Sequence, residues 1–239
     1  MKNIKLEDIK QKIISDDEYI KWMEEISIVE NEFANSSEFN NIVALDHGIQ
    51  HMNRVAETVY KLMKEYGCSK NVCYLGYISG LIHDMGMIHG KKNHAQNGSK
   101  MAKLFLKKLD FLNNSEIETV ANAIATHGDG ANAEGNIGLF LAIADKIDMC
   151  KERSLSKTSP IHLINSYNAN INYDTLDVYY EMSSSKGIEA LYMIPKSIDI
   201  PLKIAKDLGL KVKFFINGKI EDFADRKNYE GQIYKRIDK

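Results

Sequence analysis

The stretch that decides the fold is Gly80-Leu81-Ile82-His83-Asp84-Met85-Gly86, where an imidazole and a carboxylate follow one another at the end of an apolar run. Such a doublet offers two metal ligands of different kinds, although a buried His beside a capping Asp also arises by chance. The doublet gains weight because further candidate ligands surround it in the order His, His-Asp, His, His, Asp. These further residues are His51, His94, His127 and Asp145.

Two helices are expected on the N-terminal side of the doublet. Leu45 to Tyr66 carries apolar residues at steps of three and four, which predicts an amphipathic helix. His51 lies on the same face of this helix as Val55, so its side chain can point inward. Val72 to Ile82 is apolar enough for a central buried helix, and that helix delivers His83 and Asp84 at its C-terminal end.

Two more helices are expected on the C-terminal side. Ser115-x-x-Glu118 has the spacing of a capping box, and it starts a helix whose inward stripe ends at His127. The next helix runs from Ile137 to Cys150 and places Asp145 one turn after Leu141. The candidate ligands therefore converge inside a helical bundle.

Metal binding explains this convergence better than separate core residues do. A single His on an apolar stripe is more often an ordinary core residue, but several unsatisfied polar groups in one core would cost about 1–3 kcal/mol each. Imidazole and carboxylate without thiolate suit Mn, Fe, Co, Ni or Zn better than Mg or Ca. Six ligands exceed what one catalytic ion needs. We therefore expect two divalent ions, Fe or Mn first and Co, Ni or Zn as alternatives, with Asp84 as the bridge.

Composition narrows the class of protein. The 239 residues fit one sizeable domain, or a main domain with a small appendage. A net charge of −2 argues against long nucleic acids as partners. The charged N-terminus is unlike a signal peptide, and the apolar runs are too short to span a bilayer, so no membrane partner is expected. Three cysteines without metal-type spacing indicate reduced thiols in a cytoplasmic protein.

The sequence changes character after about residue 160. We expect a helical domain over residues 1–160 and a small α+β appendage over residues 161–239, which makes the fold class mainly α. The appendage is predicted from a β-rich run at Asn172 to Tyr180, a turn at Ser183 to Gly187 and a second β-like run at Ile188 to Ile194. A helix at Ile198 to Leu208 follows, and then a hairpin at Lys211 to Phe223 with a type I′ turn at Asn217-Gly218.

Residues Leu45 to Arg153 resemble the HD superfamily of metal-dependent phosphohydrolases. His83-Asp84 resembles the doublet that names this family, and the family's first His and closing Asp are matched on either side of it. The matching stretches are His51-Met52-Asn53-Arg54-Val55 and Ala144-Asp145-Lys146-Ile147-Asp148.

Two further stretches are similar to binuclear members, including HD-type diadenosine tetraphosphate hydrolases. They are His94-Ala95-Gln96-Asn97-Gly98 and Thr126-His127-Gly128. The chain departs from the HD-GYP cyclic-dinucleotide phosphodiesterases, because Gly128-Asp129-Gly130 supplies neither the second adjacent His nor the Gly-Tyr-Pro that name that group.

The resemblance implies an all-helical HD bundle with a central metal site. It also implies a phosphohydrolase that cleaves a phosphoester, of a nucleotide or dinucleotide, by a metal-bound hydroxide. By the same resemblance, His51, His83, Asp84 and Asp145 form the primary site. His94 and His127 complete a second one.

Catalytic and substrate-binding candidates surround these ligands. Asp84 is catalytic as the bridge, and His47, one turn before His51, is a candidate proton donor or an exposed capping His. Arg54 and Lys146 are candidates for phosphate contact and catalysis. The loop residues Lys91 and Lys92 are candidates for substrate binding, with solvated surface charges as the alternative. Asp129 is a candidate for orienting an imidazole.

Two other functions stay open at this point. The same ligand order could serve a di-iron oxygenase, which oxygen-dependent turnover and a mixed-valent iron pair would identify. The chain could also be a non-catalytic binding or signalling module with a vestigial site. The expected partner is a small phosphorylated substrate of nucleotide type, and a homo-oligomer is an open alternative to a monomer.

Overall fold

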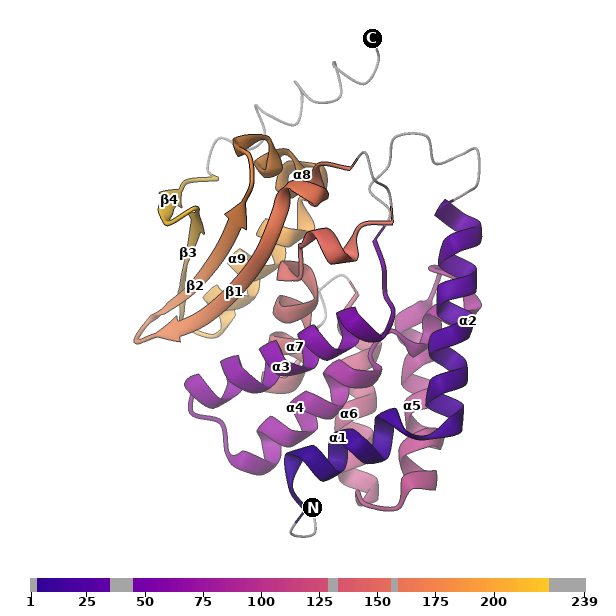
Figure 1. The fold of residues 1–239 in the computed structure, drawn as a ribbon. Helices are drawn as coiled ribbons and strands as arrows, with labels where there is room; N and C mark the ends of the chain where they lie inside the picture. The colour runs from indigo at the N-terminus through magenta and orange to yellow at the C-terminus, as the bar shows by residue number, and fades with distance from the viewer. Residues whose placement is uncertain (1–3, 35–44, 129–132, 156–158, 224–239) are drawn as a thin grey trace. The chain divides into compact units, whose positions relative to one another are not determined.

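The computed structural model describes residues 4–34, 45–128, 133–155 and 159–223 (Figure 1). The chain divides into two compact units, residues 1–32 with 47–145 and residues 33–46 with 146–239. The first unit is helical, and the second contains a four-stranded mixed sheet. The expected fold class, mainly α with a small C-terminal α+β part, is confirmed. The domain boundary near residue 160 stays a prediction.

The first unit is built from helices. In chain order they are α1 (Leu6–Ile14), α2 (Asp17–Ala34), α3 (Ile49–Glu65), α4 (Lys70–Ile82), the short 3-10 helix η2 (Met85–His89), α5 (His94–Leu109), α6 (Asn114–Thr126) and α7 (Gly135–Ile147). No helix in the described parts of the chain has both the length and the apolar character needed to cross a membrane.

Helix α4 is the central helix of this unit. Every residue from Cys73 to Ile82 is buried, as the apolar sequence predicts. α4 packs tightly against α3, because a Cβ added at Gly80 would lie 2.5 Å from the Cα of Ala56. The Tyr19 hydroxyl of α2 donates a hydrogen bond to the Leu81 carbonyl over 3.2 Å. These contacts fix the C-terminal end of α4, where the His-Asp doublet follows.

The loop after the doublet crosses the first turns of α5 at very short range. A Cβ added at Gly86 would lie 2.0 Å from the carbonyl oxygen of His94 and 2.5 Å from the backbone nitrogen of Gly98. A Cβ at Gly98 would in turn lie 3.1 Å from the carbonyl oxygen of His83. Only glycine allows backbones to approach so closely. This crossing sets the position of His94 relative to the doublet.

The capping box of α6 lies two residues earlier than predicted. The Asn113 side chain accepts a hydrogen bond from the Glu116 backbone, and the Glu116 side chain accepts one from the Asn113 backbone, both over 2.9 Å. The prediction of Ser115 with Glu118 is therefore wrong. Both pairs have the required spacing, and the helix begins at the earlier one because that adds backbone hydrogen bonds, including Ile117 N–H to Asn113 carbonyl at 3.0 Å.

The second unit contains a sheet of strand order β1-β2-β3-β4. β1 pairs antiparallel with β2, β2 parallel with β3, and β3 antiparallel with β4. The strands are β1 (Ile164–Asn172), β2 (Thr175–Met182), β3 (Lys211–Ile216) and β4 (Lys219–Glu221), and two helices, α8 (Ile188–Met193) and α9 (Lys196–Asp207), connect β2 to β3.

Two strand predictions in this unit need correction. The predicted β-like run Ile188 to Ile194 instead contains the helix α8, because two parallel strands require a crossover connection, which α8 and α9 provide. Asn172 to Tyr180 is not one strand, since Tyr173 has a φ of 53° in the turn between β1 and β2. The predicted hairpin is confirmed, with positive φ values of 49° and 76° at Asn217 and Gly218, as a type I′ turn requires.

Candidate metal centre

The side chain of His83 is fixed by the end of its own helix. His83 is the C-cap of α4, where carbonyl groups lack partners within the helix. Its Nδ1 lies 2.9 Å from the carbonyl oxygen of Gly80. A carbonyl oxygen only accepts, so Nδ1 carries the hydrogen and Nε2 presents a lone pair. This is the tautomer in which histidines bind metals through Nε2.

Two other histidines are held in the same way. The Nδ1 of His127, the C-cap of α6, lies 2.7 Å from the carbonyl oxygen of Ile124. The Nδ1 of His94, the first residue of α5, lies 2.9 Å from the carbonyl oxygen of Lys91. Each of these rings therefore also presents the lone pair of Nε2. The sequence shows the histidines but not these backbone partners.

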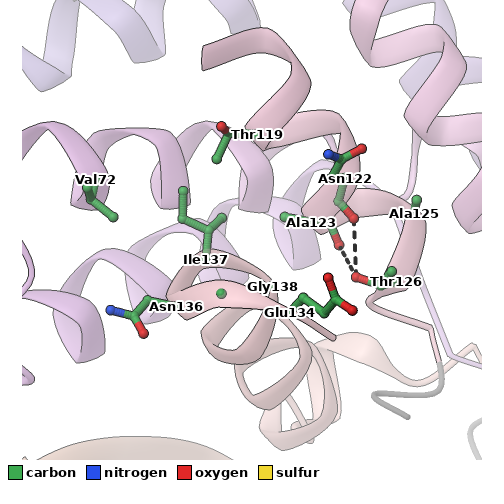
Figure 2. Close-up of a pocket in the computed structure, with 11 residues that line it drawn as sticks. Val72, Thr119, Asn122, Ala123, Ala125, Thr126, Glu134, Asn136, Ile137 and Gly138 are labelled. Carbon is green, nitrogen blue, oxygen red and sulfur yellow. Dashed lines mark hydrogen bonds between the residues drawn. The ribbon is translucent and has the colours of Figure 1, made fainter. Parts of the chain in front are cut away.

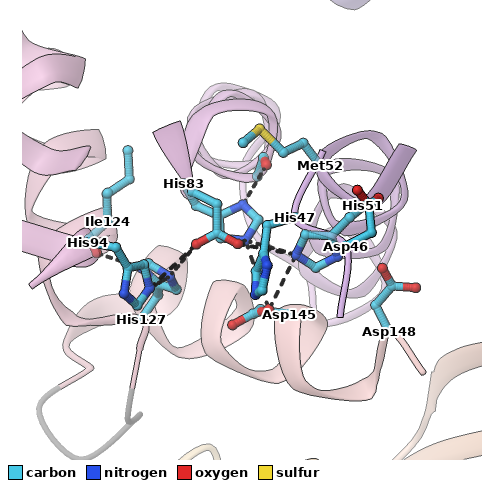
Figure 3. A network of polar contacts seen from close by, with 12 residues as sticks. Asp46, His47, His51, Met52, His83, His94, Ile124, His127, Asp145 and Asp148 are labelled. Carbon is cyan, nitrogen blue, oxygen red and sulfur yellow. Dashed lines mark hydrogen bonds and ion pairs between the residues drawn. The ribbon is translucent and has the colours of Figure 1, made fainter. Parts of the chain in front are cut away.

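A first group of candidate ligands consists of His51, His83, Asp84 and Asp145, whose ligand atoms all lie within 4.8 Å of one another (Figure 3). The Nε2 atoms of His51 and His83 are 3.2 Å apart. The Oδ2 of Asp84 lies 3.1 Å from His83 Nε2 and 3.5 Å from His51 Nε2. The Oδ1 of Asp145 lies 3.4 Å from His51 Nε2. All four residues are buried.

A second group consists of Asp84, His94 and His127. The Nε2 atoms of the two histidines are 3.3 Å apart, and the Oδ1 of Asp84 lies 3.2 Å from His127 Nε2 and 3.5 Å from His94 Nε2. His127 is fully buried, whereas the side chain of His94 is 21% exposed. Asp84 is the member that both groups share, with one carboxylate oxygen facing each.

The electrostatics of Asp84 suit a bridging carboxylate. Burial raises the pKa of this carboxyl, but the imidazoles of His83, His127 and His51 outweigh burial and hold the pKa well below its usual range. Burial lowers the pKa of His83, against the opposing attraction of Asp84. Because Nε2 of His83 and of His127 presents a lone pair, a cation bound between these rings and Asp84 would supply the positive charge that keeps the carboxylate ionised.

This donor set fits divalent cations. The Nδ1 atoms of His94 and His127 both face carbonyl oxygens, so their Nε2 lone pairs face one another at 3.3 Å and repel unless a positive charge lies between them. The free cysteines Cys68, Cys73 and Cys150 belong to neither group, so the donors are nitrogen and oxygen alone. Such a set suits Mn, Fe, Co, Ni or Zn. The structure thus brings together all six predicted ligands in a cluster consistent with divalent metal binding, while each ligand's role stays a prediction.

The sequence did not indicate a partner for His47, and the structure places Glu30 of α2 there. The Oε1 of Glu30 accepts a hydrogen bond from the backbone N–H of His47 over 2.9 Å and also contacts Nδ1 of the ring. The His47 ring in turn packs edge-on to His51, with ring centroids 5.8 Å apart. One signal for Glu30 does exist, because it continues the buried stripe of α2 formed by Tyr19, Met23 and Ile26.

The predicted substrate-binding residues occupy varied positions. Arg54 lies half-buried on α3, one turn after His51, and Lys146 lies half-buried on α7 directly after Asp145. Lys91 and Lys92 are exposed in the turn between η2 and α5. Asp129 lies outside the described residues. Contact of these residues with substrate stays a prediction.

A cavity of about 610 Å³ lies between α6, the start of α7 and Val72 of α4 (Figure 2). Its polar lining comes mainly from Asn122, Thr126, Glu134 and Asn136. Thr126 directly precedes His127 in the chain, but none of the candidate metal ligands lines this cavity. It is therefore separate from the His/Asp cluster.

Comparison with known proteins identifies the helical segment. Residues 48–150 match the family model described as HD domain. The segment is thus similar to HD domains over a little under half of the chain. The matched residues contain all six predicted ligands, so the HD resemblance is confirmed at this level. The narrower likeness to diadenosine tetraphosphate hydrolases stays a prediction.

Two individual proteins are also similar to the chain. It is 26% identical over 162 residues to ribonuclease Y 1 of Pediococcus pentosaceus, and the match covers 65% of this chain and 28% of that protein. The chain thus spans less than a third of that relative's length. The crystal structure of a predicted HD superfamily hydrolase from an uncultured Thermotogales bacterium is 19% identical with a TM-score of 0.41, and the match covers 59% of this chain and 74% of that one.

Proposed function

We propose that the HD domain of this protein is a phosphohydrolase that uses two divalent metal ions to cleave a nucleotide-type phosphoester. The observation that supports it most is the position of Asp84, whose two carboxylate oxygens face different groups of histidines. A carboxylate that bridges two ions is a common feature of sites that hydrolyse phosphoesters with paired metals.

Each group would hold one ion. The first ion would be held by His51, His83, Asp84 and Asp145, and the second ion would be held by Asp84, His94 and His127. Bound there, the ions would act as Lewis acids toward phosphoryl oxygens and lower the pKa of water toward neutrality. Fe or Mn is the first expectation for their identity, because the donors are imidazole and carboxylate without thiolate.

The remaining residues have roles set by their charge and position. Arg54, half-buried one turn after His51, offers a planar fork that pairs well with phosphate. Lys91 and Lys92, exposed beside His94, place positive charge at the more open histidine and attract an anionic substrate toward it. Lys146, directly after Asp145 on α7, is a further phosphate contact in this proposal.

Two observations support a nucleotide-type substrate. The partial similarity to a protein named ribonuclease Y 1 is in line with phosphodiester hydrolysis. A net charge of −2 favours small nucleotides over long nucleic acids as partners. A substrate screen therefore needs mononucleotides, cyclic and linear dinucleotides, diadenosine tetraphosphate and a short RNA oligonucleotide.

The test is this screen on the purified full chain after its metals have been quantified, with Mn, Fe, Co, Ni and Mg compared. Asp84→Asn keeps the shape of the side chain and removes its charge. His89→Gln is the matched control, because His89 is exposed on η2 and belongs to neither group. We expect turnover with Mn or Fe that Asp84→Asn abolishes and His89→Gln retains.

Other outcomes distinguish the competing functions. Turnover that survives in Asp84→Asn would show that the His/Asp cluster is not the site. Full metal content without hydrolysis of any phosphoester would contradict the proposal and favour a binding module. Oxygen-dependent turnover with a mixed-valent iron pair would favour an oxygenase.

A further inference from the structure

Glu30 is a buried carboxylate that contacts both the backbone and the ring of His47. Glu30 is only 4% exposed in the interior of the helical unit. An ionised carboxylate is unfavourable there unless it is paired. One oxygen, Oε1, accepts from the backbone N–H of His47 over 2.9 Å and contacts Nδ1 of the same residue. The carboxylate therefore restrains both the backbone and the ring of His47.

This pairing determines which ring nitrogen remains for chemistry. Because Nδ1 of His47 faces Glu30, Nε2 is the nitrogen on the other side of the ring. The ring also packs edge-on to the ring of His51, a member of the first ligand group (Figure 3). A carboxylate behind an imidazole, with the second nitrogen toward the reacting atoms, is the arrangement by which serine hydrolases orient their catalytic His.

We propose that Glu30 is a positioning residue that holds the His47 ring so that Nε2 donates a proton to the leaving oxygen of the phosphoester. This inference rests on the proposed function. In the balanced step, the oxygen of water bonds to phosphorus and the bond from phosphorus to the leaving oxygen breaks. The leaving oxygen takes the proton from Nε2, and a proton released by the attacking water restores His47.

A purely structural role for Glu30 makes different predictions. If Glu30 only anchored the backbone before α3, its loss would loosen His51 and reduce metal content and all turnover together. If it orients a proton donor, its loss affects only those substrates whose leaving oxygen needs a proton. Poor leaving groups, such as alkyl alcohols, depend on protonation, whereas nitrophenolate departs without it.

The experiment compares Glu30→Gln with wild type on two esters of the same phosphoryl group, one with a nitrophenyl and one with an alkyl leaving group. Gln keeps the size of the side chain and an oxygen acceptor for the His47 N–H. Glu24→Gln is the matched control, because Glu24 is exposed on the same helix. His47→Gln is the second variant, and kcat, KM and metal content are measured for each protein.

We expect Glu30→Gln to lower kcat for the alkyl ester by about 10-fold or more, below the roughly 10²–10⁴-fold value of complete acid–base catalysis. KM, metal content and kcat for the nitrophenyl ester should stay close to wild type. His47→Gln should reproduce this selectivity, and Glu24→Gln should match wild type on both esters.

Three results would overturn the inference. They are equal losses on both esters, loss of metal from Glu30→Gln, or wild-type activity of Glu30→Gln on the alkyl ester. If either variant fails to fold by circular dichroism, the other decides, because both are expected to show the same selectivity. Hydrolysis of neither ester by metal-loaded wild type, after the broader screen has also failed, contradicts the proposed function itself.

Discussion

The two groups of candidate ligands in the helical unit share Asp84 but are built differently. His51, His83 and Asp145 come from the buried interiors or ends of helices, and their side chains are at most 4% exposed. His94 comes from the first residue of α5, next to the exposed Lys91 and Lys92, and its side chain is 21% exposed. The first group is fixed by core packing, whereas the second depends on a loop and a glycine crossing. We therefore expect the second ion to be the weaker one and substrate to approach from its side.

The largest effect is expected from removal of the shared carboxylate. Asp84→Ala should lower the occupancy of both ions and abolish turnover, because each group loses an oxygen donor. The loss should exceed the roughly 10–100-fold that removal of an outer-shell partner typically costs. Metal analysis of the purified variant checks this. Normal stoichiometry would show that Asp84 bridges nothing.

Substitutions within single groups should separate the two sites. His127→Ala should reduce metal content toward about one ion per chain while the fold survives, since the first group keeps all its ligands. His51→Ala should instead weaken the first ion, because only the first group contains His51. Metal stoichiometry and melting curves compare the variants, and unchanged stoichiometry and turnover in His127→Ala would rule out the second ion.

The glycine crossing offers a way to disturb the second group without touching a ligand. Gly86→Ala forces a Cβ against the His94 carbonyl oxygen and Gly98 nitrogen, which should shift the start of α5 and lower affinity for the second ion by about 10–100-fold. Gly138→Ala is the matched control, because its Cβ would meet nothing closer than 3.6 Å. Metal titration of both variants measures their affinity for the second ion. Identical affinities in Gly86→Ala and Gly138→Ala would contradict the positioning role of the crossing.

The smallest effect is expected at the far end of the helix that carries His127. Asn113→Ala removes one half of the capping box of α6 and should lower the free energy of unfolding by about 1 kcal/mol. Because His127 lies at the other end of α6, metal stoichiometry should stay unchanged. Denaturant unfolding measures the free energy of unfolding. A change in metal stoichiometry would show that the second group is sensitive to helix stability in general.

Helical periodicity predicted that His51, the His83-Asp84 doublet and His127 would converge, whereas His94 was assigned to the cluster by the family resemblance. His51 and His127 follow inward stripes, and the doublet ends an apolar run, so their meeting required only the packing of helices. The contact between Glu30 and His47 was not predictable in this way. It joins residues from two segments whose mutual position depends on tertiary structure, and a Glu on a buried stripe does not name its partner.

Local rules failed where two segments satisfied them equally or where topology overrode them. Asn113 and Ser115 both have an acidic residue three positions later, and only the full helix shows which pair caps it. Ile188 to Ile194 has β-formers at its two ends and at Tyr192, but helix formers between them, and the parallel pairing of β2 and β3 requires a crossover there. Ile188–Met193 is accordingly helical. β-propensity is a weak guide when the sheet topology is unknown.

The most direct test of the account is a crystal structure of the protein loaded with Mn, with anomalous scattering measured to locate the ions. We predict two metal peaks on either side of Asp84. The Oδ2 atom should bind the ion held by His51, His83 and Asp145, and Oδ1 should bind the ion held by His94 and His127. A single peak, or two peaks with both Asp84 oxygens on the same ion, would contradict the central claim that one carboxylate joins two metal sites.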